Sequence, residues 1–275
     1  MGALFTYWHF DLGSILLFLL FSWFYGYLSG FKLLKGAGVY FSGLSLMLFL
    51  ELSPLHFVGM HYLLSAYMIV HIVLLLICGP MLLMGIPRGS DHRFIWQVSR
   101  FFNYWPWMGW LSAIGVMWFW HIPAVFDAVF PVNHEAFSFH WIAFLHSGTL
   151  LLAGICFSWP ILSPVKELQV NPLLGIVYLF TACIGCSILG LLLTFAPPTL
   201  YKHYFLPDEY GFSDLIKTSW GISRAKDQQM AGLMMWVPCC FIYLSGSLML
   251  VYKLLHEKEI QRPVRQELTI KEDQV

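Results

Sequence analysis

The stretch SAYMIVHIVLLL, residues 65–76, decides the fold of this chain. Its side chains are apolar apart from Ser65, Tyr67 and one imidazole, His71, and it lies within a longer apolar window over residues 62–86. About 20 predominantly apolar residues allow an α-helix to cross a membrane. The stretch therefore predicts a membrane-spanning helix, and it raises the question of why that helix contains a histidine.

The rest of the chain resembles this stretch in composition. Of its 275 residues, 59% are hydrophobic and 11% are charged, whereas soluble domains carry about 25% charged residues. Seven apolar windows are long enough to span a bilayer, at residues 12–31, 37–55, 62–86, 105–122, 138–162, 172–196 and 228–252. We therefore expect an all-α integral membrane protein with a single bundle of about seven transmembrane helices over residues 1–255. Residues 256–275 mix both charge signs without apolar periodicity, which predicts a solvated, partly disordered cytoplasmic tail.

The distribution of Lys and Arg predicts the orientation of the bundle. Cytoplasmic segments next to membrane spans carry an excess of these residues. An N-terminus outside and a C-terminus in the cytoplasm put Lys202, Lys217, Arg224 and Lys226 outside. The other eleven of the 15 basic residues are then inside: Lys32, Lys35, Arg88, Arg93, Arg100, Lys166, Lys253, Lys258, Arg262, Arg265 and Lys271. The formal net charge is zero, so no electrostatic preference for nucleic acid is visible, and none is expected as a partner. The apolar windows predict the lipid bilayer as the surroundings of the protein.

Ionisable side chains within the spans concentrate in the predicted outer half of the bundle. A rise of 1.5 Å per residue places His71, His121, His146, Glu51 and Asp227 there. Such groups are costly in hydrocarbon, so they usually face the bundle interior and serve a function. Imidazoles and carboxylates are ligands for copper and for divalent metals. We expect the three histidines and Asp227 to form a metal pocket, with Glu51 as an accessory group; the alternative is that each makes an interhelical hydrogen bond.

Two further polar residues are accessory candidates. In FHWIAFLH, His140 and His146 are six residues apart, which is about 600° around a helix. They do not share a face, so we expect the deeper His146 to point into the pocket and His140 to be accessory. Gln228 follows Asp227 directly and is the other accessory candidate.

Sulfur-containing residues offer a second possible copper site. Cys183 and Cys186, in CIGC, share one face in the middle of the sixth window, and Met230 follows the polar start of the seventh. Thiol and thioether sulfurs are soft ligands suited to Cu(I). In membrane helices, the same residues also serve as small or adaptable packing groups.

Three longer motifs stand out: DQQMAGLMMWVP (227–238), WHIPAVFD (120–127) and LGLLLTFAPPTLYKHY (189–204). They resemble the CtaG family of multi-spanning cytochrome c oxidase assembly factors, with weaker agreement at WHFD (8–11), SPL (53–55) and GPMLLMGIP (79–87). The resemblance implies seven spans in a bacterial cytoplasmic membrane and a role in maturing a haem–copper oxidase, by helping copper reach its catalytic subunit. It carries the family histidines over to His71, His121 and His146, and the family acid to Asp227.

The chain departs from the family pattern in the third window. The family usually has H-x-x-x-H there, whereas this chain reads YMIVH, with Tyr67 in the place of the first histidine. Tyr67 and His71 share a helix face, but a neutral phenol is a poor copper ligand. We therefore assign Tyr67 an accessory role.

The sequence favours an assembly factor that binds copper transiently, with oxidase subunits as partners. The alternative is a structural partner or scaffold subunit of a respiratory oxidase complex that binds no metal, and haem is left open as an occupant of the bundle. A transporter is disfavoured because the predicted inner half has few polar residues for a transport path. No recognisable catalytic motif occurs, so no enzyme and no catalytic residues are expected.

Overall fold

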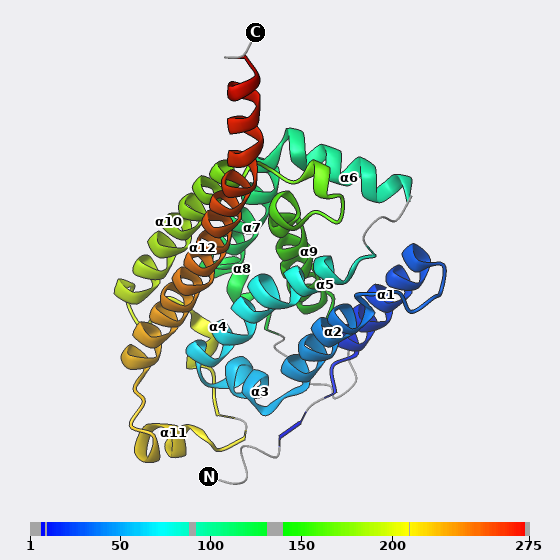
Figure 1. Cartoon of the computed structure of the whole chain (residues 1–275). Helices are drawn as coiled ribbons and strands as arrows, with labels where there is room; N and C mark the ends of the chain where they lie inside the picture. The colour runs from blue at the N-terminus through cyan, green and yellow to red at the C-terminus, as the bar shows by residue number, and fades with distance from the viewer. Residues whose placement is uncertain (1–6, 9, 88–91, 131–139, 209, 273–275) are drawn as a thin grey trace.

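The computed structural model describes residues 7–8, 10–87, 92–130, 140–208 and 210–272, with side chains as far as His256. The predicted inside charge Arg88 and the start of the 138–162 window lie outside the described residues. The described part contains helices and connecting turns without strands. The helices are α1 (Leu12–Ser29), α2 (Ala37–Leu52), α3 (Pro54–His61), α4 (Leu64–Val73), the π-helical turn η2 (Leu74–Cys78), α5 (Gly79–Gly85), α6 (Arg93–Tyr104), α7 (Pro106–Trp120), α8 (Pro123–Asp127), α9 (Trp141–Leu162), the 3₁₀ turn η3 (Lys166–Leu168), α10 (Pro172–Phe195), the 3₁₀ turn η4 (Lys202–Phe205), α11 (Ser213–Ser219) and α12 (Arg224–Glu272) (Figure 1).

The chain is a helical membrane protein. Within the described residues, five helices are long and apolar enough to cross a membrane: Leu12–Ser29, Leu64–Gly85, Trp141–Leu162, Pro172–Phe195 and Arg224–His256. A sixth span results if α2 and α3, which meet at a bend of 49°, count as one broken span. The window 105–122 forms α7, whose 15 residues cover about 22 Å, less than the ~30 Å hydrocarbon core. The all-α membrane fold is confirmed, whereas seven spans and the orientation stay predictions.

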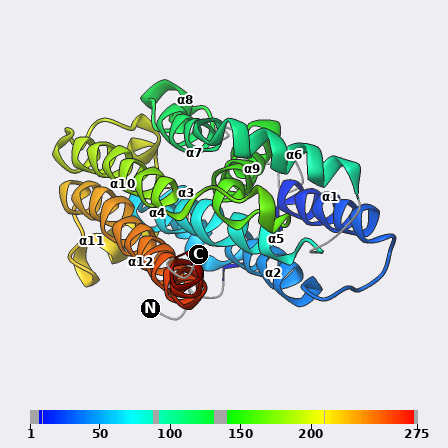
Figure 2. The same cartoon turned by 45° about the horizontal axis from the view of Figure 1, so that its top comes forward.

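The segment from α4 through α5 occupies the middle of the bundle (Figure 2). It is the most buried of the five spans and packs against α2, α3, α9 and α12. Helices α10 and α12 run side by side along one flank (Figures 1 and 2). The apolar stretch that predicted a single span is thus the core helix of the fold.

Glycines let α9 approach this central segment closely. A Cβ on Gly154 would overlap the carbonyl oxygen of Leu75, and a Cβ on Gly79 would lie 2.8 Å from the Cα of Gly154. Small residues at such contacts are typical of membrane helix pairs, because packing rather than the hydrophobic effect holds them together. The close approach brings the first half of α9, which contains His146, beside α4.

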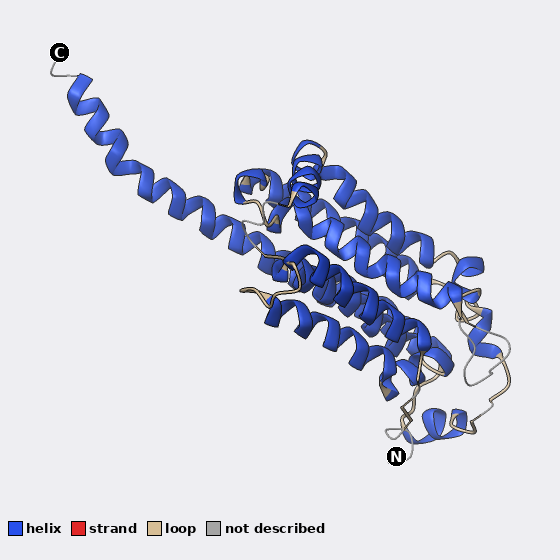
Figure 3. Ribbon diagram, turned by 90° about the vertical axis from the view of Figure 1, so that its right-hand side faces the viewer, coloured by secondary structure: helices blue, strands red, loops and turns tan. Residues whose placement is uncertain are grey.

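The two ends of the bundle differ. Helix α6 crosses one end, where the C-terminal half of α12 also lies, and α3 and α11 lie at the opposite end (Figure 1). Helix α12 continues beyond the bundle to Glu272 (Figure 3). The partial disorder expected for residues 256–275 stays a prediction, and residues 273–275 lie outside the described part.

Candidate functional site

Three histidines from three helices meet inside the bundle. His71 lies in α4, His121 is the C-cap residue of α7, and His146 lies in the second turn of α9. The ring centroid of His71 lies 5.1 Å from that of His121 and 4.9 Å from that of His146. All three side chains are buried. We call His71, His121 and His146 the histidine cluster; the sequence predicted that these residues would come together.

One nitrogen of His71 has no partner. Nδ1 of His71 lies 3.2 Å from Nε2 of His146, so one of these two nitrogens donates a hydrogen to the other. Nε2 of His71 is buried and has no hydrogen-bond partner among the described residues. A buried polar atom without a partner costs about 1–3 kcal/mol. It therefore calls for a functional explanation such as a bound ion.

His121 faces a sulfur atom that sequence reasoning missed. Its Nδ1–H donates to the carbonyl oxygen of Met117 at 2.6 Å. This fixes the tautomer of the neutral ring and leaves Nε2 with a lone pair. Nε2 lies 3.2 Å from the Sδ of Met68, which is fully buried in α4. Two electron-pair donors face each other here without a hydrogen between them, an arrangement suited to a soft cation.

Tyr67 lies against the cluster from one helical turn before His71. Its ring stacks on that of His146 at a centroid distance of 5.5 Å, and its hydroxyl lies 3.3 Å from Nε2 of His146. The hydroxyl can donate to that imidazole, and the ring excludes water from it. Tyr67 thus lies beside His146, and its accessory role stays a prediction.

Glu51 reaches the same region from the end of α2. One carboxylate oxygen accepts a hydrogen bond from the Ser147 hydroxyl at 2.7 Å, and the other accepts one from Ser14 at 3.3 Å. The ring of His56 lies between Glu51 and Tyr67: its Nδ1–H donates to the Glu51 carbonyl at 2.8 Å, and its face stacks on Tyr67 at 6.2 Å. Glu51 thus supports the residues around His146 without contacting a cluster imidazole directly.

Asp227 belongs to α12, and its side chain reaches the start of α4. It does not join the histidine cluster. Its two oxygens accept hydrogen bonds from the backbone N–H of Leu64 at 2.8 Å and of Ser65 at 3.1 Å, and from the Ser65 hydroxyl at 2.6 Å. Arg224 lies 3.5 Å away. Leu64 precedes His71 by seven residues, or about 10 Å along a helix. We call Asp227, Leu64, Ser65 and Arg224 the cap site, because the carboxylate supplies the N-terminal cap that Leu63 lacks.

The other two accessory candidates, Gln228 and His140, do not belong to the histidine cluster. Gln228 is buried and donates from its side-chain amide to the carbonyl of Leu193 at 3.0 Å, which ties α12 to α10. His140 is the N-cap residue of α9, and its side chain makes no capping hydrogen bond. The structure thus gives Gln228 a role in packing and leaves His146 as the residue of this pair in the cluster.

The candidate sulfur ligands lie between α10 and α12. The Sγ atoms of Cys183 and Cys240 are 3.1 Å apart, and the Sγ of Cys186 lies 3.3 Å from the Tyr243 hydroxyl. Met230 is 37% exposed on α12. The cysteines are free thiols that pack against one another, and the exposed thioether of Met230 does not belong to this group.

The segment between α10 and α12 covers the cluster from the outside. The Tyr201 hydroxyl donates to the carbonyl of His121 at 3.1 Å, and its ring packs on Phe126 at 4.0 Å. Phe126 in turn lies 5.5 Å from Tyr67. The predicted outer loop therefore packs over the part of the cluster that His121 and Tyr67 form.

A carboxylate orders the outer part of the same segment. The Tyr62 hydroxyl donates to Asp208 at 2.7 Å, and the backbone N–H of Ser213 donates to it at 2.7 Å. Desolvation alone would raise the pKa of Asp208, but the hydrogen bonds from Tyr62 and Ser213 outweigh it and lower the pKa to about 2. Asp208 is thus ionised at neutral pH and joins the segment to the end of α3.

The cluster has donor atoms for a metal but no complete set of His, Cys, Asp and Glu ligands. Within the part of the chain that the structure describes, no three or more of these side chains are grouped so as to hold a metal ion. The donors that do converge are imidazole nitrogens and one thioether sulfur. Nitrogen and soft sulfur together suit copper better than hard, oxygen-preferring cations.

The fold and the site define a polytopic helical membrane protein whose buried imidazoles meet inside the bundle. The family model described as cytochrome c oxidase caa3 assembly factor (Caa3_CtaG) matches residues 31–257. The match covers most of the chain, and the protein belongs to this family. Neither a curated protein nor a solved structure matches the chain.

Proposed function

We propose that this assembly factor holds copper transiently at the histidine cluster and passes it to a haem–copper oxidase subunit. The observation that carries the proposal is the buried Nε2 of His71, which has no partner among the described residues. Copper at this position would remove the cost of the unpaired nitrogen. The family description, an oxidase assembly factor, supplies the recipient.

In this proposal the ligands are the three cluster histidines and Met68. Nε2 of His121 and the Sδ of Met68 lie 3.2 Å apart and face each other. Thioether sulfur favours Cu(I). The oxygens of Asp227 are occupied by the N–H groups of Leu64 and Ser65, so Asp227 is a structural residue in this account. The proposal supports no haem site, because the described rings around the cluster pack directly on one another.

The proposal also includes the membrane setting. The protein would cross the bacterial cytoplasmic membrane seven times, with α7 as a short span and the C-terminus in the cytoplasm. The histidine cluster would then lie toward the outer surface. Oxidase subunits would be the partners, and the protein would act by delivery, without catalysing a reaction.

A scaffold without metal is the second candidate, and two interhelical contacts favour it. The hydrogen bond between His71 and His146 and the cap site both join helices that are distant in sequence. Polar contacts of this kind stabilise membrane bundles without any ligand. A scaffold would bind oxidase subunits and contain no stoichiometric copper.

Copper analysis of the purified full chain separates the two candidates. We expect copper in the wild type, its loss in His71→Phe, and its retention in the matched control His256→Phe, because His256 is exposed in the C-terminal half of α12. Equal copper in His71→Phe and wild type would remove His71 from the site. Oxidase subunits that co-purify with a wild type free of copper would favour the scaffold.

A further inference from the structure

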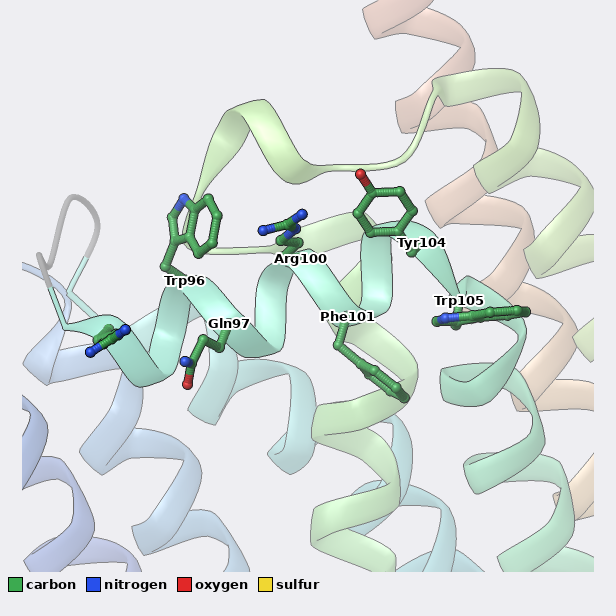
Figure 4. A pocket seen from close by; sticks show the side chains of 7 residues that line it. Trp96, Gln97, Arg100, Phe101, Tyr104 and Trp105 are labelled. Carbon is green, nitrogen blue, oxygen red and sulfur yellow. The ribbon is translucent and has the colours of Figure 1, made fainter.

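Helix α6 packs one face on the bundle, and the opposite face is exposed within the described part of the chain. Ile95, Ser99 and Phe102 are buried, and the Ser99 hydroxyl accepts hydrogen bonds from Trp159 at 3.0 Å and from Ser163 at 2.9 Å. These contacts fix which side of α6 faces outward. The helix crosses the end of the bundle, with the spans rising toward its buried face (Figures 1 and 4).

The outward face presents one arginine between two aromatic rings. Trp96, Arg100 and Tyr104 follow one another at intervals of four residues and project to the same side of α6 (Figure 4). The Cζ of Arg100 lies 5.3 Å from the Trp96 ring centroid and 5.7 Å from that of Tyr104. The cation thus lies over both aromatic rings. Its N–H groups donate to no described residue, so they are available to an external acceptor.

The surroundings of Arg100 are basic and open. The side chains lie in a depression of about 530 Å³ that Arg93 also lines. Residues 92–105 contain two arginines and no Asp or Glu. Turn η3 adjoins the helix, because Asn103 donates to the carbonyl of Leu168 at 3.1 Å. Its exposed Lys166 and Glu167 carry opposite charges, so the two arginines of α6 determine the local charge. The depression therefore attracts an anion.

We propose that this face of α6 binds the phosphate headgroup of an anionic phospholipid, with Arg100 as the phosphate contact. A guanidinium presents paired N–H donors that match phosphate oxygens. A helix that lies across the end of a membrane bundle, with Trp and Tyr beside Arg, is placed where headgroups lie. Anionic lipids attract basic residues at a membrane surface, so lipid is the occupant that charge and location both favour.

Lipid binding by the purified full chain in detergent tests the proposal. The probe is an equal mixture of phosphatidylglycerol and phosphatidylcholine, and native mass spectrometry counts the lipids retained. We expect the preference for phosphatidylglycerol to fall about fivefold in Arg100→Gln, which corresponds to the ~1 kcal/mol of one basic residue near a membrane surface. Arg100→Lys should keep part of the preference, because the charge remains and the planar fork is lost.

The controls separate lipid from other acceptors and from misfolding. Lys217→Gln removes a basic residue from α11 at the other end of the bundle and should leave the preference unchanged. Thermal unfolding of Arg100→Gln should match the wild type. The proposal is overturned if Arg100→Gln keeps the wild-type preference, or if inorganic phosphate or a polyglutamate peptide displaces the lipid at equal concentration.

Discussion

The cap site and the histidine cluster both involve α4, and they differ in how their polar atoms are satisfied. At the cap site, both oxygens of Asp227 accept hydrogen bonds and face Arg224. In the cluster, Nε2 of His71 has no partner among the described residues, and Nε2 of His121 faces the sulfur of Met68. A buried polar group with its full set of partners supports the fold, whereas one left incomplete is a candidate for binding a ligand.

The cap site predicts the largest loss of stability. Asp227→Ala leaves the N–H groups of Leu64 and Ser65 and the charge of Arg224 without their partner, which should lower the free energy of unfolding by about 3–5 kcal/mol. Denaturant unfolding in detergent measures it. Asp227→Asn, which keeps one acceptor oxygen, should lose less. A loss below about 1 kcal/mol in Asp227→Ala, the size of an exposed ion pair, would show that the cap is dispensable.

For the histidine cluster we expect the opposite pattern, a small change in stability and a large change in copper affinity. His71→Phe replaces an incompletely satisfied imidazole with a ring of similar size, so the free energy of unfolding should change by only about 1 kcal/mol. Loss of a group that only supports a metal ligand lowers metal affinity by roughly 10–100-fold. Because His71 is itself a proposed ligand, His71→Phe should lower copper affinity by more than that. Competition with a Cu(I) chelator measures the affinity. Strong destabilisation with unchanged copper affinity would make His71 a structural residue like Asp227.

Met68 tests the composition of the cluster. Met68→Leu conserves volume and should change stability by less than about 1.5 kcal/mol, yet it removes the sulfur beside His121. Affinity for Cu(I) should fall about tenfold, or ~1.4 kcal/mol. Met230→Leu, at an exposed position on α12, is the matched control. An equal affinity in the two variants would exclude the thioether as a ligand.

Tyr67 tests the departure from the family pattern. Tyr67→His places an imidazole one turn before His71 and beside His146, so Cu(I) affinity should rise several-fold through an added nitrogen ligand. Tyr67→Phe removes only the hydroxyl and should leave affinity nearly unchanged. The same chelator competition reads both variants, and a fall in affinity for Tyr67→His would contradict this geometry.

Asp208 accepts hydrogen bonds as Asp227 does, but it is exposed. Its substitution should therefore have the smallest effect on stability. Its pKa is lowered from 3.8 to about 2 in the folded chain, so the stabilisation it gives is present above pH 3.8 and is lost as the pH falls toward 2. Solvent screens this exposed group and keeps the effect small. Asp208→Asn should speed amide hydrogen exchange at Ser213 at neutral pH, and unchanged exchange would show that the carboxylate does not order the segment.

The sequence predicted the membrane bundle and the meeting of the three histidines, because apolar windows and depth along a helix are local properties. It could not place Asp227, because that carboxylate caps a helix 163 residues earlier in the chain, and helix ends are not visible in an apolar run. Met68 was missed for a related reason: a methionine among apolar residues looks like packing until its sulfur is seen beside His121.

X-ray absorption at the copper edge tests the central claim most directly. The wild-type protein, purified in detergent and loaded with one equivalent of Cu(I), should show nitrogen scatterers and one sulfur scatterer in the first coordination shell of copper, from the imidazole and thioether ligands. Met68→Leu should lose only the sulfur, and His71→Phe should bind too weakly to load. A wild type that retains no copper, or a spectrum that keeps its sulfur in Met68→Leu, would contradict the account.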